Sequence, residues 1–293
     1  MFPMYVYPRL GRAGLGNLLI PWARCELFRR DFSLPMIAPS WVQPKIGPLL
    51  RNELDLRFYT NLFDNSAYVR GVRRQILLAF AKRYSETDDA QNLQGSSYPR
   101  VMVFSGLEGY LSAFERHREY LRRRLWEITS KFVRQQVQDQ LDVAVRAIAV
   151  HVRRGDMPVS PFGSKLVSNH GIHEQWYLNV MEELVGMHRG NVEFIVYSDG
   201  ASAELSQILS FPGVKRADPR NTALTDIWLM SSGLGLVTTS SSTLSAWGAF
   251  LSEGYSVWYP GWRTQYRSGR SSDLCSSGQG DLTVVENATG RKF

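Results

Sequence analysis

Between residues 145 and 259 the chain alternates short apolar runs with longer amphipathic segments, and this alternation constrains the fold more than any other feature of the sequence. Strands separated by helices of this length form a parallel sheet that is covered by helices on both faces. The sequence therefore predicts a Rossmann-like α/β domain whose ligands bind at the carboxyl ends of the strands. The predicted strands are 145–152, 192–197, 234–239 and 255–259, and the predicted helices are 175–187, 202–209, 222–232 and 241–252.

The first half of the chain opens with a recognisable unit. A predicted strand at 4–7 is followed by a turn with Gly14, Gly16 and Asn17 and by a helical pattern at 18–30. A strand, a glycine turn and a helix in this order aim backbone N–H groups at a phosphate. Glycines near a strand end also commonly form a plain turn, so both interpretations stay open on spacing alone.

One long helix is predicted at 111–141, where apolar residues recur three, four and seven positions apart. Before it, residues 32–100 show no clear pattern apart from a polar stretch at 85–99, for which we predict an exposed loop. The basic face of the helix is most simply a solvated surface, and the alternative is a landing surface for anionic lipid or a lipid-pyrophosphate acceptor. The apolar positions are Phe114, Leu121, Leu125, Ile128 and Phe132, and the basic ones are Arg116, Arg118, Arg122, Arg123, Arg124, Lys131 and Arg134.

Composition favours a globular protein that binds anions. The 293 residues fit two α/β domains, which we place at 1–143 and 144–293. A formal net charge of +7 suits anionic ligands such as nucleotides, and no nucleic-acid-binding motif is recognisable. Cys25 and Cys275 belong to no metal-binding motif, so no metal is expected. The N-terminus lacks a signal-peptide pattern and no apolar run is long enough to span a bilayer, so we predict a cytoplasmic protein.

Polar side chains cluster where three of the predicted strands end. In the first cluster, alternation along the strand places His151 and Arg153 on one face and Arg154 on the other. A planar, permanently charged guanidinium suits a diphosphate, so Arg153 is a candidate ligand, whereas Arg154 is expected to pair with Asp156. In the second cluster Asp199 follows a strand, and capping of the next helix is favoured over contact with a ligand.

The third cluster joins Asp226 to a run of hydroxyl residues at 238–243. Hydroxyls at the start of a helix, together with its unpaired backbone N–H groups, offer several donors to phosphate oxygens, whereas ordinary capping requires only one of them. Asp226 falls where a helix begins, so a capping role is the simplest interpretation of that residue taken alone.

The three clusters resemble the three consecutive motifs of α-1,2-fucosyltransferases. HVRRGD at 151–156, the Tyr-Ser-Asp turn at 197–199 and DIWLMSSGLGLVTTSSSTLSAWGAF at 226–250 carry the resemblance, and Gly-Leu-Gly-Asn at 14–17 matches the N-terminal turn of that family. The first and third motifs are also similar to those of α-1,6-fucosyltransferases and protein O-fucosyltransferases. The motifs occur in the right order and extend over both halves of the chain.

The resemblance implies a GT-B-type fold, with two Rossmann-like domains that face a cleft and a parallel sheet in the C-terminal half. It also implies an inverting glycosyltransferase that moves L-fucose from GDP-β-L-fucose to a hydroxyl such as O2 of a galactose. Neither a metal nor another cofactor is expected. The acceptor would be an oligosaccharide or a lipid-linked glycan.

The resemblance also assigns roles to individual residues. Arg153 would hold the pyrophosphate, while His151 and Asp226 would face the guanine, whose N1–H and amine are two adjacent donors for a carboxylate. The general base is not assigned by the resemblance. Asp156 and Glu174 are candidates because they lie near the motif strand and its following loop, and we assign Asp156 to catalysis. The remaining donor contacts would come from Gly14, Gly16, Asn17, Ser241, Ser242 and Thr243.

The chain departs from the family pattern at Leu18, Pro21, Trp22, Gly200 and Trp247, which we expect to lie near the sugar and the acceptor. Two alternatives therefore stay open, namely transfer of another GDP-deoxysugar and a non-catalytic protein that binds GDP or a glycan. A Rossmann dehydrogenase is disfavoured, because the third glycine of its nucleotide-binding turn would fall at position 19, which is leucine.

Overall fold

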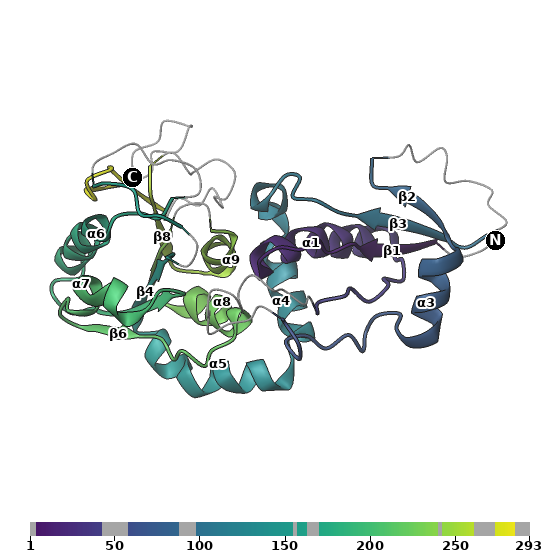
Figure 1. The fold of residues 1–293 in the computed structure, drawn as a ribbon, viewed down its shortest axis with the longest axis horizontal. Coiled ribbons are helices and arrows are strands. Elements are labelled where there is room, and N and C mark those ends of the chain that lie inside the picture. The colour runs from purple at the N-terminus through teal and green to yellow at the C-terminus, as the bar shows by residue number, and fades with distance from the viewer. Residues whose placement is uncertain are drawn as a thin grey trace.

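The computed structural model describes residues 4–42, 58–87, 98–154, 157–162, 170–239, 242–260 and 273–284. Figure 1 shows an elongated molecule with two lobes side by side, the N-terminal half on the right and most of the C-terminal half on the left. Each lobe contains a sheet. The N-terminal sheet has three strands and the C-terminal sheet has seven.

The N-terminal sheet is parallel, with its strands in the order β1 (Met4–Pro8), β3 (Arg100–Phe104) and β2 (Lys82–Ser85). Strand β1 confirms the strand predicted at 4–7, and α1 (Leu15–Phe32) confirms the helix predicted at 18–30. The sequence pattern did not reveal α3 (Gly71–Phe80), because Leu77 is the one buried residue of this described helix. Of the predicted loop at 85–99, Ser85 belongs to β2, and residues 88–97 lie outside the described residues.

The single helix predicted at 111–141 is wrong. The segment forms three pieces, η2 (Leu111–His117), α4 (Arg118–Ile128) and α5 (Lys131–Ala144). The chain is extended at Thr129, and the Ser130 hydroxyl accepts a hydrogen bond from the backbone N–H of Val133, so Ser130 caps a new helix. The break turns α5 to a new direction. As a result Phe132, which was predicted to lie on the buried face, is 56% exposed.

The basic side chains of this segment do not form one solvated face. Arg118 donates to the carbonyl oxygen of Ser252 at 2.8 Å, and Arg122 pairs with Glu253. Arg124 pairs with the fully buried Glu26 of α1 at 2.8 Å. These arginines therefore tie the segment to other elements of the fold, while Arg123 stays 70% exposed at its side chain.

The C-terminal sheet has the strand order β10-β9-β8-β7-β4-β5-β6, and every neighbouring pair is parallel except β9 and β10. The four predicted strands appear as β4 (Ala147–Val152), β5 (Glu193–Ser198), β7 (Gly235–Val237) and β8 (Tyr255–Trp258). The predicted helices appear as α6 (Glu174–Met187), η3 (Ser202–Leu205) with α7 (Ser206–Leu209), α8 (Ala223–Ser232) and α9 (Thr243–Leu251). Strands β6 (Val214–Arg216), β9 (Leu274–Ser276) and β10 (Leu282–Val284) were not predicted, because three residues are too few for alternation to be recognised. Strand β7 has the same length, but it was predicted as part of the longer segment 234–239.

Alternation along β4 divides its side chains between the two faces of the sheet. Val150 and Val152 pack in a core cluster with residues of α6 and α7. Ala149 packs on the opposite face in a cluster that includes residues of α8 and α9. His151 and Arg153 have the parity of Ala149, so they are directed to the side on which α8 and α9 lie.

One hydrophobic cluster extends over both lobes. Trp22 of α1 and Trp247 of α9 are fully buried and belong to the same cluster. The Trp247 indole N–H donates to the carbonyl oxygen of Gly16 at 2.8 Å, which ties the start of α1 to α9. Helix α5 packs against α8. The domain division at 143/144 stays a prediction.

Candidate active site

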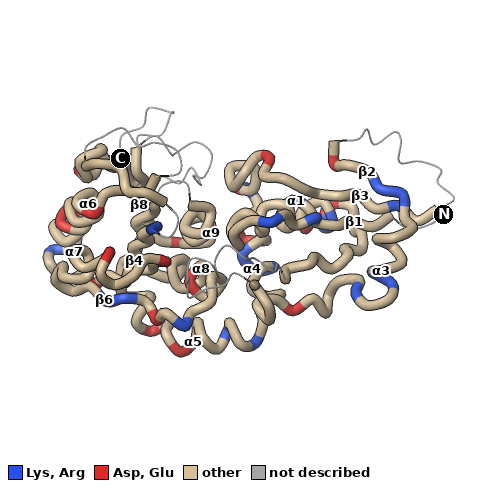
Figure 2. Tube along the Cα trace, in the orientation of Figure 1, with Lys and Arg blue, Asp and Glu red and all other residues tan. Residues whose placement is uncertain are grey.

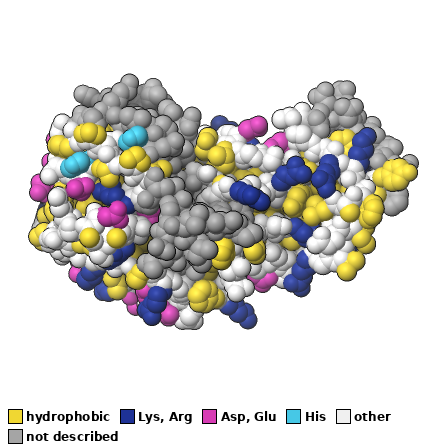
Figure 3. Space-filling model, viewed as in Figure 1, with side chains coloured by type: hydrophobic (Ala, Val, Ile, Leu, Met, Phe, Trp, Pro, Cys, Tyr) yellow, Lys and Arg dark blue, Asp and Glu magenta, His cyan; other side chains and the backbone are white. Residues whose placement is uncertain are grey.

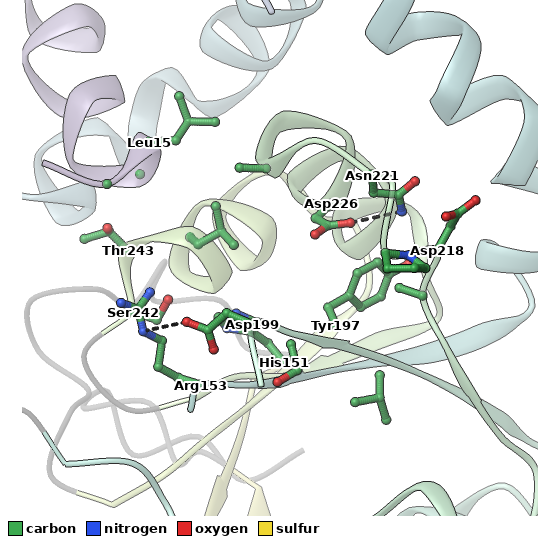
Figure 4. Close-up of a pocket in the computed structure, with 18 of the residues that line it drawn as sticks. Leu15, His151, Arg153, Tyr197, Asp199, Asp218, Asn221, Asp226, Ser242 and Thr243 are labelled. Atoms are coloured by element: carbon green, nitrogen blue, oxygen red, sulfur yellow. Dashed lines mark hydrogen bonds and ion pairs between the residues drawn. The ribbon is translucent and has the colours of Figure 1, made fainter. Parts of the chain in front are cut away.

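A pocket of about 370 Å³ opens at the carboxyl ends of β4 and β5, where the starts of α1, α8 and α9 come together (Figure 4). The strand order reverses between β4 and β7 of this sheet, and open parallel sheets bind their ligands at such a point. All predicted donor-site residues within the described part of the chain line this pocket, namely Gly14, Gly16, Asn17, His151, Arg153, Asp226, Ser242 and Thr243. Asp156 and Ser241 lie outside the described residues.

Gly16 lies at the closest approach of α1 to α9. A Cβ atom built on Gly16 would be 2.5 Å from the carbonyl carbon and 2.6 Å from Oγ1 of Thr243. Gly14 begins α1, and no described atom lies within 4 Å of its would-be Cβ. Gly16 is therefore required for the contact between the two helices, whatever part the turn plays in binding phosphate.

Replacing Gly16 with alanine should separate the starts of α1 and α9. We expect Gly16→Ala to lower the free energy of unfolding by about 1–3 kcal/mol, the usual cost of overpacking, and to weaken binding of the pocket's ligand as well. Gly14→Ala is the matched control for unfolding, because its φ of −64° is open to alanine and the added methyl has room. Gly14 also lines the pocket, so the comparison of the two variants concerns the free energy of unfolding. Thermal unfolding and titration with GDP measure both effects. Equal behaviour of the two variants would contradict this role of Gly16.

Arg153 and Arg154 point in different directions, as the alternation predicted. Arg153 lines the pocket, and its Nε lies 3.4 Å from Oδ2 of Asp199. Arg154 is 4% exposed, donates to the carbonyl oxygen of Ile172 at 2.9 Å and pairs with Glu174 at 3.3 Å. Arg154 thus holds the chain after β4 to the start of α6, and Arg153 is the arginine of the pair that lines the pocket. The predicted pairing of Arg154 with Asp156 falls outside the described residues.

Asp199 does not cap the next helix, contrary to the favoured prediction. The N-cap of η3 is Ala201, whose backbone N–H donates to the carboxylate of Glu204. Asp199 instead accepts a hydrogen bond from the backbone N–H of Arg154 at 2.8 Å while its other oxygen faces Arg153. Its carboxylate therefore orients the two consecutive arginines at the end of β4.

Nδ1 of His151 and Oδ1 of Asn17 are buried at the pocket and have no hydrogen-bond partner among the described residues. Such atoms are costly unless a ligand or water pairs with them. Burial lowers the pKa of His151 to about 4, with the Arg153 guanidinium acting in the same direction and Asp199 in the opposite one. The imidazole is therefore neutral at pH 7, with one N–H donor and one acceptor nitrogen.

Asp226 lies in the first turn of α8, but it is not the cap. Thr222 is the N-cap, because its side chain accepts a hydrogen bond from the backbone N–H of Thr225. Oδ1 of Asp226 accepts a hydrogen bond from Nδ2 of Asn221 at 3.1 Å (Figure 4). The carboxylate therefore lines the pocket in an orientation that Asn221 supports. Burial, and secondly Asp226, raise the pKa of the adjacent Tyr197 far above its usual range.

The run of hydroxyl residues divides between the core and the pocket. Thr238 donates to the carbonyl oxygen of Val257, and Thr239 accepts from the hydroxyl of Tyr177, each at 2.8 Å in the buried interior. Ser242 and Thr243, at the start of α9, line the pocket. The first two hydroxyls of the run thus form hydrogen bonds inside the core, and the pair at the helix start lines the pocket.

Some residues that line the pocket were not singled out from the sequence. Tyr59, which accepts a hydrogen bond from the backbone N–H of Leu15 at 2.8 Å, comes from the region without a pattern. Arg216 is the last residue of the short strand β6, and Asn221 lies in the segment that follows it. The polar segment 216–221 before the capping Thr222 is a strand-end signal of the kind used for the other clusters, but the strand that precedes it, β6, was not predicted.

The structure places the departures from the family pattern in the packed interior. Leu18, Pro21, Trp22 and Trp247 are buried in the core, and Gly200 is packed against the side chain of Arg154. None of these residues is among the described residues that line the pocket. Within the described part of the chain these five residues therefore serve packing, and their relation to the sugar and the acceptor stays a prediction.

Comparison with known proteins decides the family. The sequence model of glycosyl transferase family 11 matches residues 72–272, which is more than half of the chain. The protein belongs to glycosyl transferase family 11. The predicted resemblance to α-1,2-fucosyltransferases is thereby confirmed, and the protein is a glycosyltransferase of the fucosyltransferase family. A search of curated proteins found no match.

Solved structures share the fold. The fucosyltransferase NodZ from Bradyrhizobium matches with a TM-score of 0.55 at 12% identity, over 98% of this chain and 99% of that one. POFUT1 in complex with GDP matches with a TM-score of 0.53 at 12% identity, over 85% of this chain and 95% of that one. These are GT-B-type fucosyltransferases, so the predicted GT-B-type α/β fold is confirmed. At this level of identity the likeness concerns the fold alone.

Proposed function

We propose that this family 11 glycosyltransferase transfers L-fucose from GDP-β-L-fucose to O2 of a galactose in a glycan acceptor, with inversion and without a metal. The observation that carries the proposal is the pocket, which joins Arg153 and the start of α9 to an aspartate supported by Asn221. NodZ structures of the same fold were obtained with GDP and with GDP-fucose, which supports the choice of donor.

The donor would lie along the pocket with its diphosphate and its base at opposite ends. Figure 4 shows Arg153, Ser242 and Thr243 on one side of the pocket. Asp226, Asn221, Tyr197 and Asp218 lie on the other side, with Asp199 and His151 between the two groups. We place the diphosphate at the first side, because a guanidinium and a helix N-terminus both favour anions. Guanine belongs at the second side, because its two adjacent donors suit the carboxylate of Asp226.

The chemistry follows from the charges that develop. As the bond from sugar to phosphate breaks, the sugar gains oxocarbenium character and GDP gains negative charge. Arg153, held in place by Asp199, and the N-terminus of α9 would stabilise the departing diphosphate. The acceptor hydroxyl would attack from the opposite face, with Asp156 as the proposed base. Glu174 is less suited to that task, since its carboxylate pairs with the buried Arg154.

The test is transfer itself. The purified protein should convert GDP-fucose and a galactose-terminated oligosaccharide into a fucosylated product with an α-1,2 linkage, which NMR of the product identifies. Transfer should persist in excess EDTA. Preference for another GDP-sugar in the same assay would overturn the choice of fucose, and an absolute requirement for Mn²⁺ or Mg²⁺ would overturn the metal-free mechanism. Binding of GDP without product from any donor and acceptor pair would indicate the non-catalytic alternative.

A further inference from the structure

The outer face of α3 carries large apolar side chains in water. Val72, Ile76 and Phe80 follow one another at intervals of four residues and are therefore on one side of the helix. Their exposed fractions are 76%, 53% and 80%. Single exposed apolar residues are common on protein surfaces, but a continuous stripe on one helix marks an interaction site.

The surroundings of this stripe are strongly basic. Between Asp64 and Glu86 the sequence contains no acidic residue. Figure 2 shows basic positions on α3 and β2 at the far end of the N-terminal lobe, and Figure 3 shows hydrophobic and basic side chains next to each other at that end. The basic residues of this stretch are Arg70, Arg73, Arg74, Lys82 and Arg83, of which Arg74 is only half-buried and the others are exposed.

A hollow beside the start of α3 adds to the basic character. It measures about 370 Å³ and is lined by Arg29, Arg70 and Arg73 together with Tyr68. Arg73 is positioned by a hydrogen bond of 2.7 Å to the hydroxyl of Tyr5, and Arg29 by its ion pair of 2.6 Å with Glu26. Guanidinium groups that converge in this way suit a phosphate group.

An apolar stripe with flanking cations has the chemistry of a helix that lies in the headgroup region of a bilayer, with its apolar face among the acyl chains. Helix α3 has 10 residues, and no described helix is long and apolar enough to cross a membrane. The uniform positive charge requires a negatively charged partner, and anionic lipid surfaces attract clusters of Lys and Arg. A hydrophobic protein partner would not account for the basic hollow.

We propose that this α3 surface, comprising Val72, Ile76, Phe80, Arg70, Arg73, Lys82 and Arg83, docks the protein on an anionic membrane. The three apolar side chains enter the headgroup region, and the arginines of the hollow bind lipid phosphate. Helix α1, about 27 Å long at 1.5 Å per residue, runs between this end and the donor pocket, so the pocket stays in water. The site differs from the alternative considered for 111–141, whose arginines are largely engaged with the protein.

Co-sedimentation of the whole protein with vesicles tests the proposal. The protein should bind vesicles of phosphatidylcholine with phosphatidylglycerol, bind pure phosphatidylcholine much more weakly, and dissociate as the salt concentration rises. The triple variant Val72→Ser/Ile76→Ser/Phe80→Ser and the double variant Arg70→Glu/Lys82→Glu should each lower the partition coefficient by about tenfold or more. All changed side chains are exposed, and unchanged affinity for GDP confirms that each variant is folded.

Two control variants remove the same kinds of side chain elsewhere. Phe132→Ser/Val143→Ser/Met187→Ser replaces three exposed apolar residues, and Arg123→Glu/Lys131→Glu reverses two exposed charges of the 111–141 segment. Both should bind anionic vesicles like the parent. Absence of vesicle binding by the parent, equal binding by the α3 variants, or loss of binding in the controls would each overturn the proposal. So would a dimer in sedimentation equilibrium that only the α3 apolar variant dissociates, since the stripe would then be an interface between two copies.

Discussion

Arg153→Ala should reduce the turnover of GDP-fucose by about 10²–10³-fold, which corresponds to roughly 3–4 kcal/mol of transition-state stabilisation. Arg153 lines the pocket, its guanidinium is oriented by Asp199, and the pocket wall beside it is the start of α9. Arg153→Lys should be nearly as inactive, because an ammonium cannot make the planar two-point contact with a diphosphate. Steady-state kinetics with purified variants measure the effect.

Arg154→Ala is the matched control for this prediction. Arg154 is buried against Ile172 and Glu174, so its loss should lower the thermal midpoint and affect turnover more mildly. Arg153→Ala should unfold at nearly the temperature of the parent, because its side chain is partly exposed at the pocket. If Arg153→Ala retained turnover within about tenfold of the parent, or about 1.4 kcal/mol, while Arg154→Ala was inactive though folded, the assignment of the leaving-group contact would be wrong.

Asp226→Ala should weaken binding of GDP by about 10–150-fold, the range expected from about 1.5–3 kcal/mol for hydrogen bonds to a charged group. Inosine diphosphate lacks the exocyclic amine, so it makes one fewer bond to the carboxylate and should lose less affinity. Calorimetric titration of the parent and the variant with both nucleotides gives the comparison. Asn221→Ala should reproduce part of the loss, because the amide of Asn221 holds Oδ1 of Asp226.

Asp218 provides a second carboxylate at the same end of the pocket for comparison. It pairs with Arg220 at 2.7 Å, and its hydrogen bonds with Arg220 lower its pKa to about 2. Any effect of Asp218→Ala should therefore be equal for the two nucleotides. If Asp226→Ala also lost equal affinity for GDP and for inosine diphosphate, Asp226 would stabilise the fold and would not contact the base.

The sequence by itself determined the features that depend on local pattern. The strands that became β4 and β5 were recognisable because five or six residues are enough to display burial and alternation. The same alternation distinguished Arg153 from Arg154, since neighbouring side chains on a strand point to opposite faces. The motifs then identified the family. Together with the Gly-Leu-Gly-Asn turn they also contain many of the residues that line the pocket, because carboxyl ends of parallel strands meet at one edge of a sheet.

Only the tertiary structure decided features that depend on contacts between distant parts of the chain. Gly16 is tied to Thr243 and Trp247, a contact that no pattern around residue 16 could reveal. Asp199 was expected to cap a helix, but its carboxylate instead contacts the two arginines at the end of a neighbouring strand. Local sequence fixes which way a side chain points along its own element, whereas its partner is set by the packing of elements that lie far apart in the sequence.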